Sequence, residues 1–391
     1  MKKKSLFFIL LAGVLLINTS LSAALGDITP VLTILLFDDG FPGVEPRIVT
    51  LNDLLVRPWG LAFLPDNRML VSEKGGRMVI LSADGTIVQE IVDELPLVAA
   101  LGQGGLLDIE LDPDFTNDPW VYWTYAEPGT GVEEGLAGTA VARGRLVDNT
   151  LQDVEVIYRQ VPKVSGVGHF GSRLAFRSDK TLFVTLGERQ KRSPAQDLAT
   201  TLGKVVRINR DGTVPTDNPA IEGARPEIWS YGHRNPQGAA IRPGGDELWI
   251  TEHGPQGGDE LNQIIAGENY GWPLVSYGCN YGDPVGDACR IGGGTHSPNY
   301  IEPISYWVPT SIAPAGMIFY TGIGFPQWQD NVFMGALAGK ALWRVELSGN
   351  TEVAREPLFS DLGERIRDVE QGPDGWIYLL TDSGKLIQIR D

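Results

Sequence analysis

One strand pattern recurs along this chain of 391 residues. It consists of an apolar strand, a Pro-Asp or Asp-Gly turn, a second strand, a Gly-rich turn and a third strand, first read as GLAFLPDNRMLVSEKGGRMVIL from Gly60. Similar segments begin at Gly105, Ser172, Gly238, Gly316 and Arg367. Six repeats at intervals of roughly 45 to 80 residues predict an all-β chain folded as a six-bladed β-propeller with loops of unequal length. A pair of β-sandwiches is the alternative, but it would not explain the repeat.

Helical periodicity is almost absent, and the short polar segment 196–202 is the one modest helix candidate. The 48 glycines and 26 prolines agree with a chain of many turns. Repeats stacked around one axis bury a shared core, so we predict one propeller domain over residues 47–391 rather than two or three domains.

The first 46 residues differ from the rest. Three lysines follow Met1, then come an apolar run over residues 6–17 and small residues over 20–24. This order is typical of a secretory signal peptide, and the run is too short for a comfortable membrane span. We therefore predict a signal peptide over 1–24, cut after Ala24, Ala23 or Ser22, and a linker over 25–46 with room for one outer strand. The product is expected to be periplasmic or secreted, without membrane insertion.

Charge excludes some partners. Removing three of the 32 basic residues with the signal peptide, against 49 acidic ones, leaves a net charge near −20. Nucleic acid and anionic membrane surfaces are therefore not expected partners. The two cysteines, Cys279 and Cys289, stand close together. In an exported chain they predict one local disulfide; a metal pair is the weaker alternative, since no matching His or Cys set lies nearby.

The segment 227–278 concentrates special backbone and charged groups. An Arg-Asn pair precedes Pro236, a Gly-Pro kink follows the strand-like run ELWI, and an Asp-Glu pair follows two glycines. Pro and Gly punctuation predicts loops at strand ends, where binding groups collect on a rigid sheet. Taken alone, however, each piece could be a plain turn or a solvated hairpin.

The motifs GHRNPQG, EHGP, GGDE and NYGWP occur here in one order. With the rest of the chain from about residue 54 onward, they resemble the soluble quinoprotein aldose dehydrogenases, the family of the soluble glucose dehydrogenase that uses pyrroloquinoline quinone (PQQ) and calcium. The resemblance implies oxidation of the C1 hydroxyl of an aldose to a lactone, with hydride transfer to PQQ. The sequences of these motifs are similar to those of the bacterial aldose sugar dehydrogenase branch, which implies broad aldose specificity. No CxxCH haem motif occurs, so electrons are expected to leave to an external acceptor.

The candidate catalytic pair is His169 and Glu188. His169 stands in VSGVGHFGSRLAF, a Gly-rich turn before an apolar strand, and Glu188 follows the next strand, 19 residues on. By itself, a lone histidine at a turn is more often a hydrogen-bonded structural residue. The resemblance implies that His169 is the base that takes the proton of the anomeric hydroxyl and that Glu188 orients it. The family usually has Asp at that place, so Glu188 is a departure in length.

PQQ is a planar quinone with three carboxylates, so its site needs cations, amides and a stacking ring. The resemblance assigns this role to residues in LGQGG, GHRNPQG, CNYGD and GERIRD: Gln103, Arg234, Asn235, Tyr281, Arg365, Ile366 and Arg367. Arginines two residues apart lie on one face of a strand and can reach one anion, although RIR alone would suggest a surface charge stripe. The family has a Lys where this chain has Ala338. Either Lys340 reaches the quinone from a shifted loop, or main-chain groups of Leu337, Ala338 and Gly339 replace it.

Calcium prefers hard oxygen ligands, including backbone carbonyls. The resemblance implies that the carbonyls of Gly254 and Pro255 hold a calcium ion beside the quinone. It further implies that Glu260 and the Tyr270 carbonyl hold a second, structural calcium. Asp259 either assists there or caps a turn.

Two other functions remain open from the sequence. A calcium-dependent lactonase propeller would need a carboxylate and amide cage around a central metal and would have no use for the spaced arginines. A non-catalytic propeller that binds a carbohydrate or a protein is favoured by the two departures, Glu188 and Ala338.

Overall fold

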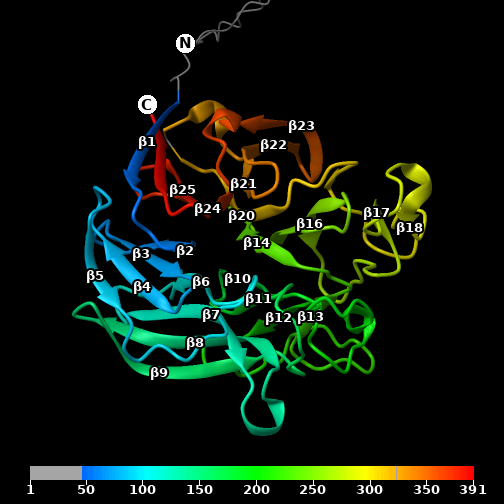
Figure 1. The fold of residues 1–391 in the computed structure, drawn as a ribbon, viewed down its shortest axis with the longest axis horizontal. Coiled ribbons are helices and arrows are strands. Elements are labelled where there is room, and N and C mark those ends of the chain that lie inside the picture. The colour runs from blue at the N-terminus through cyan, green and yellow to red at the C-terminus, as the bar shows by residue number, and fades with distance from the viewer. Residues whose placement is uncertain (1–45, 323) are drawn as a thin grey trace, which may run out of the picture. The chain divides into compact units, whose positions relative to one another are not determined.

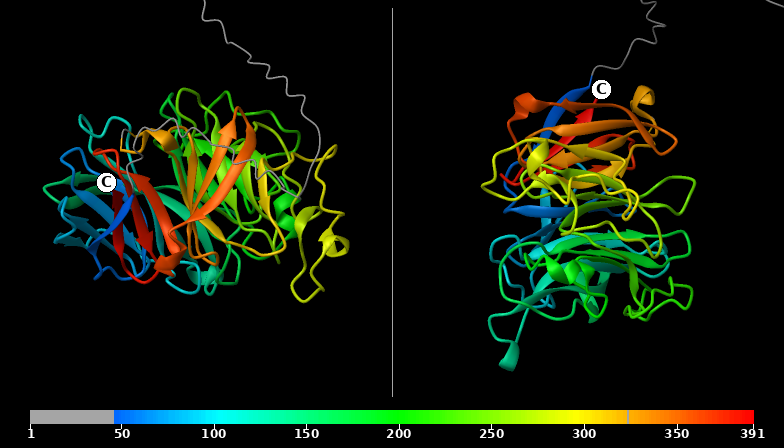
Figure 2. Two further views of the ribbon diagram at one scale, coloured as in Figure 1. Left: turned by 90° about the horizontal axis from the view of Figure 1, so that it is seen from above. Right: turned by 90° about the vertical axis from the view of Figure 1, so that its right-hand side faces the viewer.

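The structure, a computed structural model, describes residues 46–322 and 324–391. Six four-stranded antiparallel sheets stand around a central axis as the blades of a propeller, and a two-stranded sheet projects from one of them (Figure 1). Figure 2 shows the same blades from above and from the side. The predicted six-bladed propeller is therefore confirmed. The predicted signal peptide and nearly all of the linker lie outside the described residues.

Each sequence repeat begins at or next to an innermost strand, which explains why the pattern was readable. The inner strands are β2 (Pro58–Phe63), β6 (Leu106–Leu111), β10 (Gly171–Phe176), β14 (Pro236–Ile241), β20 (Pro314–Phe319) and β24 (Ile366–Gln371). They neighbour one another in chain order, and β24 lies beside β2. The ring is closed.

The other strands of each blade follow outward. The second strands are β3 (Met69–Glu73), β7 (Trp120–Pro128), β11 (Leu182–Leu186), β15 (Leu248–Glu252), β21 (Val332–Ala336) and β25 (Ile377–Thr381). The third strands are β4 (Arg77–Leu81), β8 (Ala137–Val147), β12 (Lys204–Ile208), β16 (Asp259–Ile264), β22 (Leu342–Ser348) and β26 (Leu386–Arg390). The outer strands are β5 (Ile87–Ile91), β9 (Thr150–Arg159), β13 (Ile228–Tyr231), β19 (Ser305–Trp307) and β23 (Thr351–Leu358), with β1 (Arg47–Asn52) completing the last blade.

The last blade joins the two ends of the described chain. Strand β1 pairs with β26, with Arg47 opposite Arg390, so the blade contains three C-terminal strands and one N-terminal strand (Figure 1). Pairing β1 with β26 also covers a sheet edge that would otherwise be open to other chains. The closure holds the first and last blades together, and both contribute to the site described below.

Apolar side chains fill the spaces between blades. Leu70 and Ile80 of the first blade pack in one cluster with Trp123 of the second, and Trp249 of the fourth blade meets Phe319 of the fifth edge-on. Each fully buried side chain of this size contributes about 1.5–3 kcal/mol. Around the axis, the Arg173 guanidinium lies 2.7 Å from Asp108 and 2.7 Å from Asp368, which ties β6, β10 and β24 together.

The helix expected at 196–202 is not formed. A single 3-10 turn, η2 (Ser193–Gln196), takes its place. The Lys204 ammonium donates to the carbonyls of Pro194, Ala195 and Leu202, which fixes both ends of the segment in an irregular conformation. The other short 3-10 turns are η1 (Gly131–Glu133), η3 (Asp287–Cys289), η4 (Pro326–Trp328) and η5 (Ser360–Leu362). In the described ranges, no helix has the length and apolar character needed to cross a membrane.

Candidate active site

The predicted functional residues gather at one end of the propeller. His169, Arg234 and Arg365 stand just before inner strands, whereas Glu188 and Gly254 stand just after second strands. In an antiparallel blade, the start of the first strand and the end of the second lie at the same edge. Residues from the third, fourth and sixth blades, far apart in the sequence, therefore line one mouth of the channel.

His169 and Glu188 form a buried pair at this mouth. The His169 Nδ1 atom lies 2.7 Å from Glu188 Oε1, and the two residues are 6 % and 1 % exposed. His169 has a left-handed backbone with φ of 53°, and its N–H donates to Gln103 Oε1 at 2.7 Å. The His169 carbonyl fills the space that a Cβ would need at Gly187, so only glycine fits there. The imidazole is thus fixed from three sides.

Electrostatics keep His169 neutral and Glu188 ionised. Burial, together with the Arg234 charge, lowers the pKa of His169, although the hydrogen bond to Glu188 acts in the opposite direction. Burial alone would raise the pKa of Glu188, but the His169 hydrogen bond and the Arg192 N–H, 2.9 Å from Glu188 Oε2, lower it below its usual value. A neutral imidazole that donates Nδ1–H to a carboxylate carries its lone pair on Nε2. This is the protonation state of a general base.

Arg189 was not predicted from the sequence, and it fixes the loop that carries His169. Its guanidinium donates to the carbonyls of Ala137, Gly166 and Gly168, and it lies 3.7 Å from the centre of the Phe170 ring. Its own N–H donates to the His169 carbonyl at 3.1 Å. Burial lowers the pKa of Arg189 to about 10. The only sequence signal was its place beside Glu188.

Arg234 and Asn235 present free donors. Both are buried, and Arg234 Nε and Asn235 Nδ2 have no hydrogen-bond partner among the described residues. The other groups of these side chains are held in place: an Arg234 Nη donates to the His253 carbonyl at 3.0 Å, and Asn235 Oδ1 accepts from Gly171 N at 3.1 Å. Buried donors are nearly always satisfied in native proteins, so these two indicate a ligand with acceptor oxygens.

Two histidines behind this turn, the buried His233 and the partly buried His253, have different roles. Glu252 accepts the N–H of Arg234 and bonds to His233, which also bonds to Ser230. This Ser-His-Glu series is fully enclosed and supports the turn. His253, to which the sequence assigned no role, donates Nε2–H to the Pro314 carbonyl; burial, aided by the charges of Arg234 and Arg367, lowers its pKa to about 3. It is neutral at every pH of interest.

The two arginines of RIRD share one carboxylate, as their spacing indicated. Arg365 Nε lies 2.9 Å from one oxygen of Asp382, and Arg367 Nε lies 3.1 Å from the other. Ile366 between them is buried in β24. Arg367 also donates to Gln237 Oε1 at 2.7 Å and is buried, whereas Arg365 is exposed and donates to the Leu337 carbonyl. Asp382 escaped the sequence analysis because it lies in another turn of the blade.

The segment 337–340 offers fewer free groups than expected. The N–H groups of Leu337, Ala338 and Gly339 donate to the carbonyls of Ala313 and Ile312. Lys340 is exposed, has a left-handed φ of 47°, and lies near enough to Glu364 to lower the pKa of that carboxyl, on which burial and the Lys385 hydrogen bond act more strongly.

The Gly254 loop is held by Asp259. Asp259 Oδ1 accepts the Gly254 N–H at 2.8 Å, and Oδ2 accepts from Ser311 Oγ and from the N–H groups of Ile312 and Ala313. Asp259 therefore acts as the turn cap, the second of its two predicted roles. Among the described residues, none donates a hydrogen bond to the carbonyls of Gly254 or Pro255.

Glu260 and Tyr270 line a small cavity of about 10 Å³, together with Glu252 and His296. Such a volume holds about one water or small ion. Burial, reinforced by the Glu252 charge, raises the pKa of Glu260 to about 8. Its oxygens contact Asn262 Nδ2 at 3.0 Å and His296 Nε2 at 3.5 Å. No group of three or more His, Cys, Asp or Glu side chains suited to a metal occurs in residues 46–322 and 324–391.

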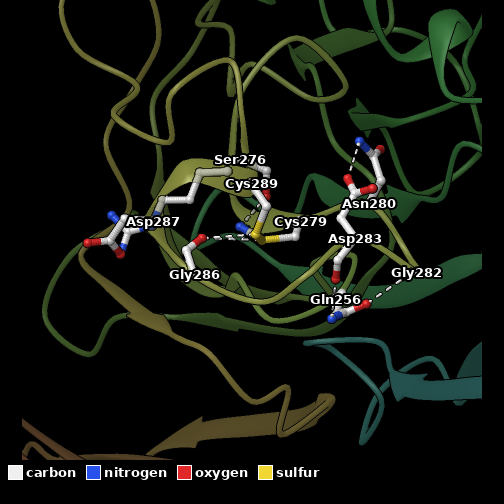
Figure 3. Close-up of a disulfide and its surroundings, with 11 residues drawn as sticks. Gln256, Ser276, Cys279, Asn280, Gly282, Asp283, Gly286, Asp287 and Cys289 are labelled. Atoms are coloured by element: carbon white, nitrogen blue, oxygen red, sulfur yellow. Dashed lines mark hydrogen bonds and ion pairs between the residues drawn. A yellow bond between two sulfur atoms is a disulfide. The ribbon is translucent and has the colours of Figure 1, made fainter.

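Figure 3 shows the disulfide that closes the loop in which Tyr281 stands in the sequence. Cys279 and Cys289 are bonded, with their Cα atoms 5.1 Å apart, which confirms the predicted disulfide; they flank β17 (Ser276–Cys279) and β18 (Arg290–Ile291). Gln256, next to the Gly254 loop, exchanges backbone hydrogen bonds with Cys279 at 3.0 Å. Tyr281 is 72 % exposed, and its hydroxyl lies 3.5 Å from Arg234. The loop thus brings an aromatic ring to the mouth.

The chain is similar in sequence and in structure to known sugar dehydrogenases. The sequence profile described as Glucose / Sorbosone dehydrogenase matches residues 55–388. The aldose sugar dehydrogenase YliI of Escherichia coli is 45 % identical over 88 % of this chain and 92 % of its own length. A crystal structure of the soluble aldose sugar dehydrogenase of E. coli in its apo form has a TM-score of 0.81 at 43 % identity, covering 88 % and 99 % of the two chains. The PQQ-bound form of an aldose sugar dehydrogenase from Streptomyces coelicolor has a TM-score of 0.71 at 27 % identity, covering 88 % and 98 %.

Proposed function

The chain belongs to the glucose/sorbosone dehydrogenase family, a family of oxidoreductases that act on sugars, and we propose how its own residues perform that activity. It oxidises the C1 hydroxyl of aldoses to lactones, with PQQ and calcium as cofactors, and passes electrons to an external acceptor. The single observation that carries this proposal is the buried His169–Glu188 pair at a mouth lined by arginines.

The donors at the mouth fit PQQ. Arg234 Nε and Asn235 Nδ2 are buried N–H groups without partners, and an anionic cofactor with carbonyl and carboxylate oxygens would satisfy both. Arg367 supplies a buried positive charge, and Gln103 and Tyr281 line the entrance. The free main-chain carbonyls of Gly254 and Pro255 fit a hard cation such as calcium. When bound, PQQ would supply a quinone that accepts a hydride from the sugar, and calcium would polarise its carbonyl.

We assign the role of proton acceptor for the sugar hydroxyl to His169. Its Nε2 lone pair accepts that proton, and the ionised Glu188 stabilises the imidazolium that results. Holding the ring through Nδ1, the backbone N–H and the Arg189 clamp reduces the motion that would misalign Nε2. Glu188 performs this role although it is longer than the Asp usual in the resemblance.

A second calcium is proposed for the Glu260–Tyr270 cavity. Glu260 and Glu252 both line this cavity; burial raises the pKa of Glu260, and repulsion from the Glu252 charge adds to the shift. A calcium ion held by the Glu260 carboxylate and the Tyr270 carbonyl would remove that repulsion. Export to the periplasm or beyond is proposed from the predicted signal peptide and supported by the Cys279–Cys289 disulfide, since such bonds persist in oxidising compartments.

One experiment tests the whole proposal. The mature chain is purified from a host that lacks PQQ, and dye reduction by a panel of aldoses is measured with PQQ, with calcium, with both and with neither, alongside a His169→Ala variant. We expect activity only with both additions, and a loss of about 10²–10⁴-fold in the variant. Binding of PQQ without sugar oxidation would overturn the substrate class. No PQQ binding at all would overturn the proposal and favour a binding propeller.

A further inference from the structure

Lys74 lies at the same mouth, although the sequence presents it only as part of a Gly-rich turn. It is the first residue after β3, the place that His253 occupies after β15, Leu337 after β21 and Asp382 after β25. It is 7 % exposed, and its ammonium donates to the Gly102 carbonyl at 2.8 Å. Gly102 directly precedes Gln103, which holds the His169 N–H. The first blade thus contributes a buried cation to the site.

The charges around Lys74 do not balance. Burial is the largest cause of a lowered pKa of about 8 for Lys74; the positive charges of Arg367 and Arg57 act in the same direction, while Asp382 acts in the opposite one. Asp382 is already paired with Arg365 and Arg367. Lys74 and Arg367 are both buried, and the one carboxylate beside them is shared with the exposed Arg365. Net positive charge therefore remains in a poorly solvated place, which is costly unless an anion binds there.

The hydrogen bonds of Lys74 lead to the same conclusion. An ammonium has three N–H groups. Among the described residues, only the Gly102 carbonyl is within hydrogen-bond distance of it, and that acceptor is neutral. A purely structural lysine in this protein looks different: Lys204, which is fully buried, donates to three carbonyls. Lys74 has capacity left for a charged acceptor.

We propose that Lys74 is a cofactor-positioning residue, whose ammonium binds a carboxylate of PQQ together with Arg367 at the seam between the first and last blades. The proposal rests on the proposed function and assigns this task to Lys74 instead of Lys340, which is exposed and lies beside Glu364. Because Gly102 adjoins Gln103, the same ammonium links the cofactor to the loop that holds His169.

PQQ binding to the full-length mature apo-protein tests the proposal without relying on turnover. The dissociation constant is measured by fluorescence quenching at pH 7 for the wild type, Lys74→Met, Lys74→Arg and Lys340→Met. We expect Lys74→Met to weaken binding roughly tenfold or more, as loss of a charge-assisted hydrogen bond does. Lys74→Arg should stay within a few-fold of the wild type, and Lys340→Met within about twofold.

The pH dependence of the wild type provides a second measurement, which does not require Lys74→Met to fold. Burial and neighbouring charges lower the pKa of Lys74 to about 8, so Lys74 loses its proton between pH 7 and 9.5, whereas Asp382, whose pKa is lowered, stays ionised. Wild-type affinity for PQQ should therefore fall as the pH rises, and the Lys74→Arg variant should lose this dependence. A Lys74→Met protein that binds PQQ as tightly as the wild type, or equal pH profiles for wild type and Lys74→Arg, overturns the proposal while leaving the proposed function intact. A wild type that binds no PQQ overturns both.

Discussion

His169 Nδ1 lies 2.7 Å from Glu188 Oε1, and these two residues lie at the same edge of one blade, one before β10 and the other after β11. Their register is set by the sheet: Gly171 of β10 lies opposite Leu186 of β11. The pair is therefore fixed by backbone pairing as well as by its own hydrogen bond. A short strand hairpin delivers both an imidazole and the carboxylate that orients it.

Replacing Glu188 with Gln tests the carboxylate charge. The amide oxygen can still accept Nδ1–H, so the ring orientation is kept, but the imidazolium formed during turnover loses its negative partner. We expect kcat to fall roughly tenfold or more at saturating PQQ, less than in His169→Ala. Steady-state rates with a good aldose provide the measurement, and Glu188→Asp is the control that keeps the charge. An unchanged kcat in Glu188→Gln would assign the carboxylate a structural role only.

The pH profile follows from the lowered pKa of His169. A base works in its deprotonated form, so activity is lost as the pH falls through the pKa of the folded protein, and burial places this pKa below the usual 6.5. The acidic limb of kcat/KM should therefore lie below pH 6.5. Glu188 raises the pKa of His169, so Glu188→Gln should move the limb to still lower pH. A limb above 6.5, or an upward move in the variant, would contradict the assignment.

Arg189 should contribute strongly to stability. Truncation to Met leaves the carbonyls of Ala137, Gly166 and Gly168 without their donor in a buried place, and each unsatisfied group costs about 1–3 kcal/mol. We expect a clear drop in Tm, with reduced activity in the protein that remains folded because the His169 loop loosens. The matched control is Arg159→Met, an exposed arginine paired with Glu127, for which we expect about 0.5 kcal/mol or less. Equal shifts in Tm for the two variants would argue against the clamp.

The sequence predicted the parts of the molecule that depend on local order. The strand, turn and strand repeat beginning at Gly60 was readable because the periodicity of each strand and the Gly and Pro punctuation lie within about 20 residues. His169 and Arg234 stood out because each precedes an inner strand in a motif with a known family resemblance. The helix expected at 196–202 is not formed; Lys204, outside the segment, instead donates to the carbonyls of Ala195 and Leu202 at its two ends.

Some residues of the site could not be identified from the sequence because closure of the propeller ring brings them together. Lys74 and Asp382 are 308 positions apart, and they face the same anion site only because β1 pairs with β26 and brings the first and last blades together. Arg189 was obscured for another reason: its partners are main-chain carbonyls, which have no sequence signature. The orientation of Lys340 depends on a left-handed backbone at that residue, which no propensity indicates for lysine.

Calcium should stabilise the protein through Glu260 even without PQQ. In the absence of calcium, the buried Glu260 carboxylate lies near Glu252, and burial with this repulsion raises its pKa. A Glu260→Gln variant removes the repulsion, so its Tm in a chelator should equal or exceed that of the wild type. Calcium at 100 times its Kd stabilises a folded protein by about 2.7 kcal/mol, and the variant should lose most of that gain. The two Tm curves against calcium concentration should therefore cross. Parallel curves, with the same calcium-induced rise in both proteins, would show that the ion binds elsewhere and that Glu260 is buried for another reason.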